Sequence, residues 1–138
     1  MQAQIGKGAL LEELRTKITS STMKEATPFG SIVEHNLVGE ATGVFSARHT
    51  ETITVFFKHD RAYEWDTKFS QTTNEGDFIV GTGHGTGKMT GPNSHEDEGE
   101  VLFMTQSPRL SWLNNKKARI ESTGDMKTGE TYEKIFAL

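Results

Sequence analysis

Two polar residues that precede an apolar run have the residue types and the spacing for proton transfer. His49 and Glu51 lie two positions apart, and in an extended strand they share a face with Ile53 and Val55. A carboxylate beside an imidazole can orient the ring, or keep its own proton when it is buried. A turn or bulge near 48–50 would reverse the faces and place both residues at the rim of the fold. We favour this second arrangement, because one inserted residue is enough to shift the register.

His84 is the next candidate, because it lies in a run, 81–87, with glycine at every second position. The run does not match a phosphate-binding loop, which would need Gly where Thr82 stands and Ser or Thr where Met89 stands. The dinucleotide-binding fingerprint is also absent, so the run indicates a curved strand. If Phe78 faces inward, His84 does too. If the glycine face is inward, His84 faces solvent, and the missing side chains of the glycines leave a cavity in the interior.

Several classes of chemistry are excluded or disfavoured by the composition. The chain has no Cys, which excludes a disulfide framework, a thiolate metal cluster and a catalytic thiol. There is no Gly-x-Ser-x-Gly motif for acyl transfer. The nearest approach to a metal site is the run 95–98, His-Glu-Asp-Glu, which we expect in a loop and which lacks calcium-loop spacing. We therefore expect no metal and no cofactor. The net charge of −4 argues against partners such as nucleic acid or an acidic membrane.

Alternation of apolar and polar residues dominates the chain from about residue 16 onward, and it predicts strands. The clearest strand, 61–70, places Tyr63, Trp65 and Phe69 on one face, and it forms a hairpin with 52–57 through the connection 58–60. Further strands are predicted at 17–24, 31–38, 41–47, 78–89, 100–105, 109–113, 117–122 and 130–137. The one helix-like pattern is 9–15, where three leucines share a face.

These elements predict an all-β fold in one domain, 1–138. The apolar share of 33% suits an antiparallel sheet whose alternate residues face water. Many short strands separated by turns are typical of a sandwich or a barrel. The alternating glycines favour the barrel, because closing a small barrel needs tight curvature. We expect a small antiparallel β-barrel of about eight strands, with a short N-terminal helical or irregular segment.

Three motifs give the chain a resemblance to a known class of barrels. They are the strand start at 39–43, Gly-Glu-Ala-Thr-Gly, the aromatic strand Tyr63-Glu64-Trp65, and the glycine strand at 81–87. Over about 17–138 the chain resembles the allene oxide cyclase-like barrels, and more narrowly the bacterial domain-of-unknown-function family numbered 3224. The resemblance implies a lumen open at one end and a homo-oligomer as a state to expect. Enzymes of the wider class fold a flexible apolar substrate, but none of their catalytic motifs matches this chain residue by residue.

Our leading interpretation is a protein that binds a small, partly apolar molecule in its lumen. Tyr63, Trp65 and Phe69 would contact the ligand, with His49, Glu51 and His84 as polar anchors. One alternative is an isomerase or cyclase that uses Glu51 or His49 to carry a proton; another is a structural, oligomeric module with a solid-packed barrel. The volume of the interior distinguishes them, because a lumen without a cavity of at least about a few hundred cubic ångströms would count against both ligand hypotheses. Neither a signal-peptide core at 1–11 nor a transmembrane stretch is evident, so we expect a soluble, cytoplasmic protein.

Overall fold

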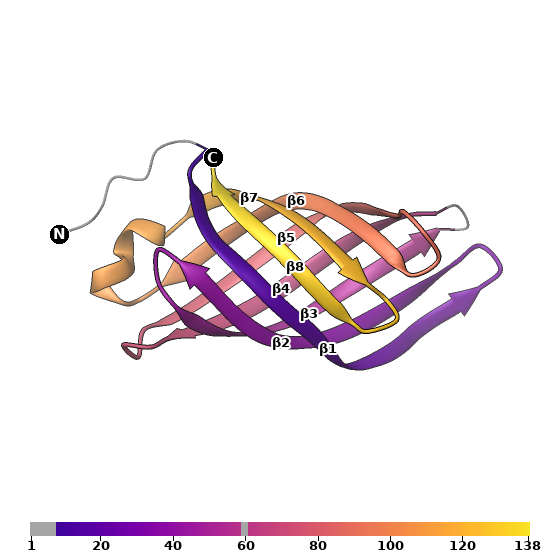
Figure 1. The fold of residues 1–138 in the computed structure, drawn as a ribbon, viewed down its shortest axis with the longest axis horizontal. Coiled ribbons are helices and arrows are strands. Elements are labelled where there is room, and N and C mark those ends of the chain that lie inside the picture. The colour runs from indigo at the N-terminus through magenta and orange to yellow at the C-terminus, as the bar shows by residue number, and fades with distance from the viewer. Residues whose placement is uncertain (1–7, 59–60) are drawn as a thin grey trace.

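The protein forms a closed antiparallel barrel in a computed structural model that describes residues 8–58 and 61–138 (Figure 1). Each strand pairs with its neighbour in sequence, and β1 also pairs with β8, which closes the barrel. The strands are β1 (Leu10–Thr27), β2 (Gly30–Gly43), β3 (Ala47–Lys58), β4 (Ala62–Thr73), β5 (Phe78–Met89), β6 (Ser94–Thr105), β7 (Lys116–Asp125) and β8 (Glu130–Ala137). The predicted barrel of about eight strands is confirmed. In the described part of the chain, no helix is long and apolar enough to span a membrane.

The glycines of β5 lie directly opposite the large aromatic side chains of β4. Phe69 pairs with Gly81, and Trp65 pairs with Gly85, and all four side-chain positions face the interior. A Cβ atom on Gly81 would collide with the Phe69 ring, and one on Gly85 would collide with the Trp65 ring. The glycine face is therefore inward, as one of the two arrangements predicted, and His84 is exposed on the outside. Aromatic rings, rather than an empty cavity, occupy the space that these glycines leave.

One end of the barrel is closed by apolar side chains. The connection between β6 and β7 forms a 3-10 helix, η1 (Pro108–Leu113), which buries Leu110 and Leu113 against the barrel core. The predicted strand at 109–113 is therefore wrong. The proline at the start favours a helical turn, and residues three apart share one face of a 3-10 helix. The short loop between β2 and β3 adds Phe45 to the same core.

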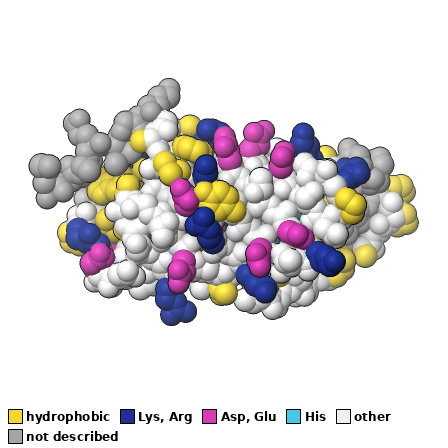
Figure 2. Space-filling model, in the orientation of Figure 1, with side chains coloured by type: hydrophobic (Ala, Val, Ile, Leu, Met, Phe, Trp, Pro, Cys, Tyr) yellow, Lys and Arg dark blue, Asp and Glu magenta, His cyan; other side chains and the backbone are white. Residues whose placement is uncertain are grey.

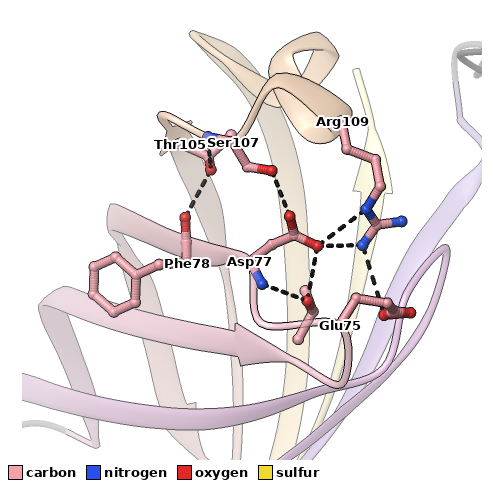
Figure 3. A network of polar contacts seen from close by, with 7 residues as sticks. Glu75, Asp77, Phe78, Thr105, Ser107 and Arg109 are labelled. Atoms are coloured by element: carbon pink, nitrogen blue, oxygen red, sulfur yellow. Dashed lines mark hydrogen bonds and ion pairs between the residues drawn. The ribbon is translucent and has the colours of Figure 1, made fainter.

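Asp77, in the loop between β4 and β5, ties η1 to the barrel (Figure 3). Its carboxylate accepts hydrogen bonds from Ser107 Oγ at 2.5 Å, from Thr73 Oγ1 at 2.9 Å and from the guanidinium of Arg109. These donors, Arg109 first, lower the pKa of Asp77 to about 2. Glu75 lies 3.6 Å from Arg109 Nη2 and adds a second carboxylate to the guanidinium. The network holds the cap of the closed end in place.

The first strand differs from its predicted form. β1 begins at Leu10, so the helix-like pattern at 9–15 is wrong. A register shift between Leu10 and Glu12 puts the neighbouring residues Leu11 and Glu12 both in buried positions, and Leu14 is buried as well. This bulge gives the leucines a spacing of three, which imitates one face of a helix. Pairing with β2 and β8 satisfies the backbone of this segment, whereas an isolated helix of this length would be marginally stable in water.

Two further predicted boundaries are corrected by the pairing. The predicted strands 31–38 and 41–47 are largely one strand, β2, and the chain reverses only after Gly43. The run 95–98, predicted as a loop, belongs to β6, and β6 pairs with β5 and β7 along this run. The hairpin of β3 and β4 is confirmed by their antiparallel register, although His59 and Asp60 of its predicted connection lie outside the described residues. The opposite end of the barrel, away from η1, carries the β1–β2, β5–β6 and β7–β8 turns (Figure 1).

Candidate functional site

His49 and Glu51 face the interior of the barrel. β3 pairs with β2 and with β4 without a register shift from Ala47 to Phe57, so the bulge that we favoured is wrong. His49 is 2% exposed and Glu51 is 8% exposed. Because side chains alternate between the two faces of an unbroken strand, His49 and Glu51 point to the same inner face as Val55.

A chain of hydrogen bonds connects these two residues across the interior. His49 Nε2 lies 2.8 Å from Glu51 Oε1, and Thr67 Oγ1 donates to Glu51 Oε2 at 2.5 Å. Gln71 Nε2 donates to His49 Nδ1 at 3.1 Å and to Glu12 Oε1 at 2.8 Å. Because Nδ1 accepts from Gln71, this pattern assigns the imidazole proton to Nε2, from which it is donated to Glu51. Side chains from β1, β3 and β4 thus form one continuous polar network.

Glu12 is the most deeply buried acid of this network. Burial raises the pKa of its carboxyl group to about 7, and the hydrogen bond from Gln71 and the nearby His49 offset only part of that rise. Its Oε2 atom has no hydrogen-bond partner among the described residues. The carboxyl group therefore keeps its proton to a higher pH than an exposed glutamate does.

A second polar cluster lies toward the open end, on β4, β6 and β7. Tyr63 donates its hydroxyl hydrogen to Asp97 Oδ1, and Ser122 Oγ donates to Oδ2 of the same carboxylate at 2.9 Å. His95 Nδ1 lies 3.2 Å from the Tyr63 hydroxyl. Burial, and the charge of Asp97 next to it, raise the pKa of Tyr63. The phenol therefore stays protonated and acts as a donor to Asp97.

Glu133 on β8 is buried between the two clusters. It is 7% exposed, and no described residue forms a hydrogen bond or an ion pair with its carboxyl group. Burial raises its pKa well above the usual value, and the carboxylates of Glu51, Asp97 and Glu12 raise it further. Such a group needs a partner in the space that it faces.

That space is a small cavity at the open end, with a volume of about 50 Å³. Apolar and polar side chains line it together: Ile18, His35, Leu37, Glu51, Ile53, Val55, Phe57, Tyr63, Met89, His95, Asp97, Met126, Thr131 and Glu133. Sites for drug-sized molecules usually enclose about 300–1,000 Å³. The lumen is thus filled largely by its own side chains. The cavity falls below the volume of about a few hundred cubic ångströms that we set for a ligand enclosed in the lumen, which counts against full enclosure.

The six predicted ligand-binding residues are distributed over three environments. Glu51 and Tyr63 line the cavity. His49, Trp65 and Phe69 are buried but do not line it; the two aromatic residues belong to the core, and His49 supports Glu51. His84 lies on the outer surface, outside the lumen.

Residues that sequence reasoning missed complete the site. His95 and Asp97 continue the inward face of Val101 and Phe103 along β6, and Glu133 continues that of Ile135 along β8. The alternation could have indicated all three, but the prediction of a loop at 95–98 hid the first two. In the described part of the chain, no group of three His, Asp or Glu side chains has an arrangement that could hold a metal ion.

A larger hollow, of about 910 Å³, lies over residues of β3 to β8. It is lined mostly by outward-facing side chains, and Tyr63, Asp97 and Ser122 of the second cluster also line it. Acidic and basic residues are mixed in it, among them Glu98, Glu121, Lys88 and Lys134. The same mixture of both signs is visible on the face shown in Figure 2. A mixed, open surface of this kind is ordinary for a solvated sheet, so we assign the candidate site to the interior.

The fold and the interior site define this protein as a closed eight-stranded antiparallel barrel with an apolar cap at one end and buried acids toward the other. Solved structures share this fold. A β-barrel-like protein from Acinetobacter baumannii matches with a TM-score of 0.82 and 14% identity, over 99% of this chain and 98% of its own. A conserved protein of unknown function from Rhodopseudomonas palustris matches with a TM-score of 0.77 and 12% identity, over 98% of this chain and 100% of its own.

A third structure with this fold is described as an enzyme, from Penicillium herquei. It matches with a TM-score of 0.63 and 17% identity, over 98% of this chain and 99% of its own. At such low identities the matches show the fold alone. No family model and no curated protein matches the sequence of this chain.

Proposed function

We propose that the open end of the lumen binds a small, partly apolar molecule. The observation that carries this proposal is the cavity itself, where a buried acid without a partner faces an apolar wall. Glu133 supplies the polar group, and Ile53, Val55 and Met89 supply apolar surface in the same cavity. Ligand sites are usually concave and mostly apolar, with a few polar groups, and a titratable residue in them often has a perturbed pKa.

The small volume limits what can bind. A cavity of about 50 Å³ accepts a very small molecule, or one end of a longer molecule whose remainder lies at the mouth. Met89 and Met126 line the cavity, and unbranched thioether side chains can repack around an entering group. We therefore expect the ligand to insert a head group rather than to be enclosed entirely.

Native mass spectrometry of the protein purified from its own host tests this proposal. We expect a retained small molecule that is lost in Val55→Phe, because Val55 is 5% exposed and a larger side chain there fills the cavity. The matched control is Val38→Phe, which makes the same change at a position that is 45% exposed. Circular dichroism of both variants confirms that the barrel is intact. Retention of the molecule by Val55→Phe would place its binding elsewhere.

A second candidate is an isomerase or cyclase that acts in the same cavity, as the resemblance to allene oxide cyclase-like barrels suggests. Glu51 lines the cavity and is hydrogen-bonded to His49, so this carboxylate could exchange a proton with a bound substrate. The structural neighbour from Penicillium herquei is itself described as an enzyme. Conversion of the retained molecule by the wild-type protein, and its loss in Glu51→Gln, would support this candidate over simple binding.

The packed interior also supports the third alternative, a structural module. Native spectra that show an oligomer without a bound molecule, from material purified in the native host, would favour it over both ligand proposals. The same measurement therefore separates the structural module from both ligand functions, and the conversion assay separates catalysis from simple binding.

A further inference from the structure

Acidic side chains predominate around the cavity at the open end, to which His35 and His95 contribute imidazole rings. Three carboxyl groups line it, those of Glu51, Asp97 and Glu133, whereas no described residue of its lining is a Lys or an Arg. Of the lining histidines, His35 has a pKa lowered by burial and by the nearby His95, so its ring favours the neutral form. The cavity thus offers acceptors without a fixed positive charge to satisfy them.

The three carboxyl groups differ in how they are satisfied. Glu51 accepts hydrogen bonds from His49 and Thr67, as described above. Asp97 accepts from Tyr63 and Ser122. Glu133 has no such partner in the described part of the chain, although it is more than nine-tenths buried. A buried carboxylate without a partner is strongly unfavourable, so Glu133 keeps its proton to a higher pH than an exposed glutamate. A cation that enters the cavity would favour release of this proton and would then pair with the Glu133 carboxylate.

A protonated amine fits this arrangement better than other donors. An ammonium group carries three N–H donors and a positive charge, and it would relieve the mutual repulsion of the buried carboxylates. The rings of Phe57 and Tyr63, with centroids 5.1 Å apart, line the same cavity and offer aromatic surface to a cation. A bare metal ion fits less well, because no described group of three ligands could hold one.

We infer that the ligand of the open end carries a positively charged head group, a protonated amine, which Glu133 binds inside the barrel while the apolar part of the ligand lies against Ile53, Val55 and the two methionines. This inference rests on the function proposed above and specifies its class of ligand. A neutral or anionic ligand of the same shape should bind more weakly, because it leaves Glu133 unpaired or adds a further negative charge.

Three small molecules of similar shape and different charge test the inference. Isobutylammonium, isobutanol and isobutyrate are titrated separately into the ¹⁵N-labelled protein at pH 7, and the amide signals of Val55, Thr131 and Glu133 are followed. We expect isobutylammonium to bind at least tenfold more tightly than isobutanol, and isobutyrate to bind most weakly. In Glu133→Gln the preference for the ammonium should disappear. The matched control, Glu98→Gln, removes a carboxylate from the outer surface and should keep it.

A measurement on the wild-type protein keeps the test independent of how the variant folds. Nuclear Overhauser effects between the isobutyl methyl groups and the methyl groups of Met89 and Met126 should place the bound ammonium compound in the cavity. Equal affinities for isobutylammonium and isobutanol at the cavity amides would overturn the inference about charge and leave the proposed function standing. If none of the three compounds shifts those amides, the proposed function fails, and this inference fails with it.

Discussion

The Nε2 atom of His49 lies 2.8 Å from Oε1 of Glu51, two residues further along β3 and inside the barrel. Successive inward positions of one strand therefore form a buried hydrogen-bonded pair. The pair is not isolated, since Gln71 bonds to the other nitrogen of the ring and Thr67 bonds to the other oxygen of the carboxylate. Buried polar groups of this kind stabilise a fold only while each has its partner.

Breaking this pair should destabilise the barrel in a non-additive way. We expect His49→Phe and Glu51→Leu each to lower the free energy of unfolding by about 1–3 kcal/mol, because each leaves a buried polar group without its partner. The double variant should lose less than the sum of the two. Urea denaturation of the four proteins measures this coupling. Strict additivity would contradict a direct interaction between the two side chains.

The buried acid Glu12 should make stability fall as pH rises. The folded state holds its proton up to a pKa of about 7, whereas the unfolded state releases it near 4.5. Between these values the folded state binds more protons, so the free energy of unfolding decreases by up to about 1.4 kcal/mol per pH unit. Glu133, whose pKa is also raised, acts in the same direction.

Glu12→Gln tests this dependence, because an amide can still accept the hydrogen bond from Gln71 and does not ionise. We expect the variant to be more stable than wild type at pH 8 and to lose less stability between pH 5 and 8. The exposed Glu40→Gln is the control and should follow the wild-type curve. Denaturation curves at several pH values measure both effects, and parallel curves for Glu12→Gln and wild type would argue against a raised pKa.

The contact between Gly81 and Phe69 predicts a rescue. A methyl group at Gly81 would overlap the Phe69 ring, so Gly81→Ala should lower the free energy of unfolding by about 1–3 kcal/mol. In a Phe69→Ala background the same change should have little effect, because the obstructing ring is gone. Thr82→Ala, on the exposed face of the same strand, should shift stability by no more than about 0.5 kcal/mol. An equal loss for Gly81→Ala in both backgrounds would refute this contact.

The Asp77 network predicts a loss of stability that depends on pH. Asp77→Asn removes the negative charge and one of the two acceptor oxygens that hold Arg109 and Ser107, so the cap η1 should loosen and Tm at pH 7 should fall. Because the folded-state pKa of Asp77 is about 2, below the usual value of 3.8, its contribution is complete above pH 4. That contribution is lost as pH falls through about 2, so the two melting curves should converge there.

Glu75→Gln is the matched control for this prediction. Its carboxylate also faces Arg109, but the side chain is 57% exposed, and exposed ion pairs contribute little. We expect a much smaller change in Tm than for Asp77→Asn. A difference between Asp77→Asn and wild type that persists unchanged at pH 2 would show that the charge of Asp77 is not what holds the cap.

Much of the fold could be predicted because its determinants are local. Alternation along 61–70 correctly placed Tyr63, Trp65 and Phe69 on the inner face, and the glycines at 81–87 indicated a curved strand. Alternation failed where one residue altered the period, as at the bulge between Leu10 and Glu12, or where a proline began a 3-10 turn after Ser107. Both are local departures whose signals are short and ambiguous.

The candidate site was only partly predictable. The inward pair of His49 and Glu51 is visible as a pattern, but choosing it over a bulge required the pairing of β3 with both neighbours. The position of His84 required knowing which face of β5 was filled by the rings of β4. Glu133 became a candidate only when its lack of a partner could be seen in three dimensions.

The sequence by itself determined which residues alternate between the two faces of each strand, since the period of two is a property of the extended backbone. It also determined that glycines alternate with larger residues along β5 and that aromatic residues share one face of β4, because each pattern lies within a single strand. Only the tertiary structure decided that Glu12, His49, Asp97 and Glu133 share one interior, and which end of the barrel η1 closes. Closure of the barrel brings together strands that are far apart in the chain. Two buried acids come close to each other only in the closed barrel, so their mutual effect on pKa arises only there.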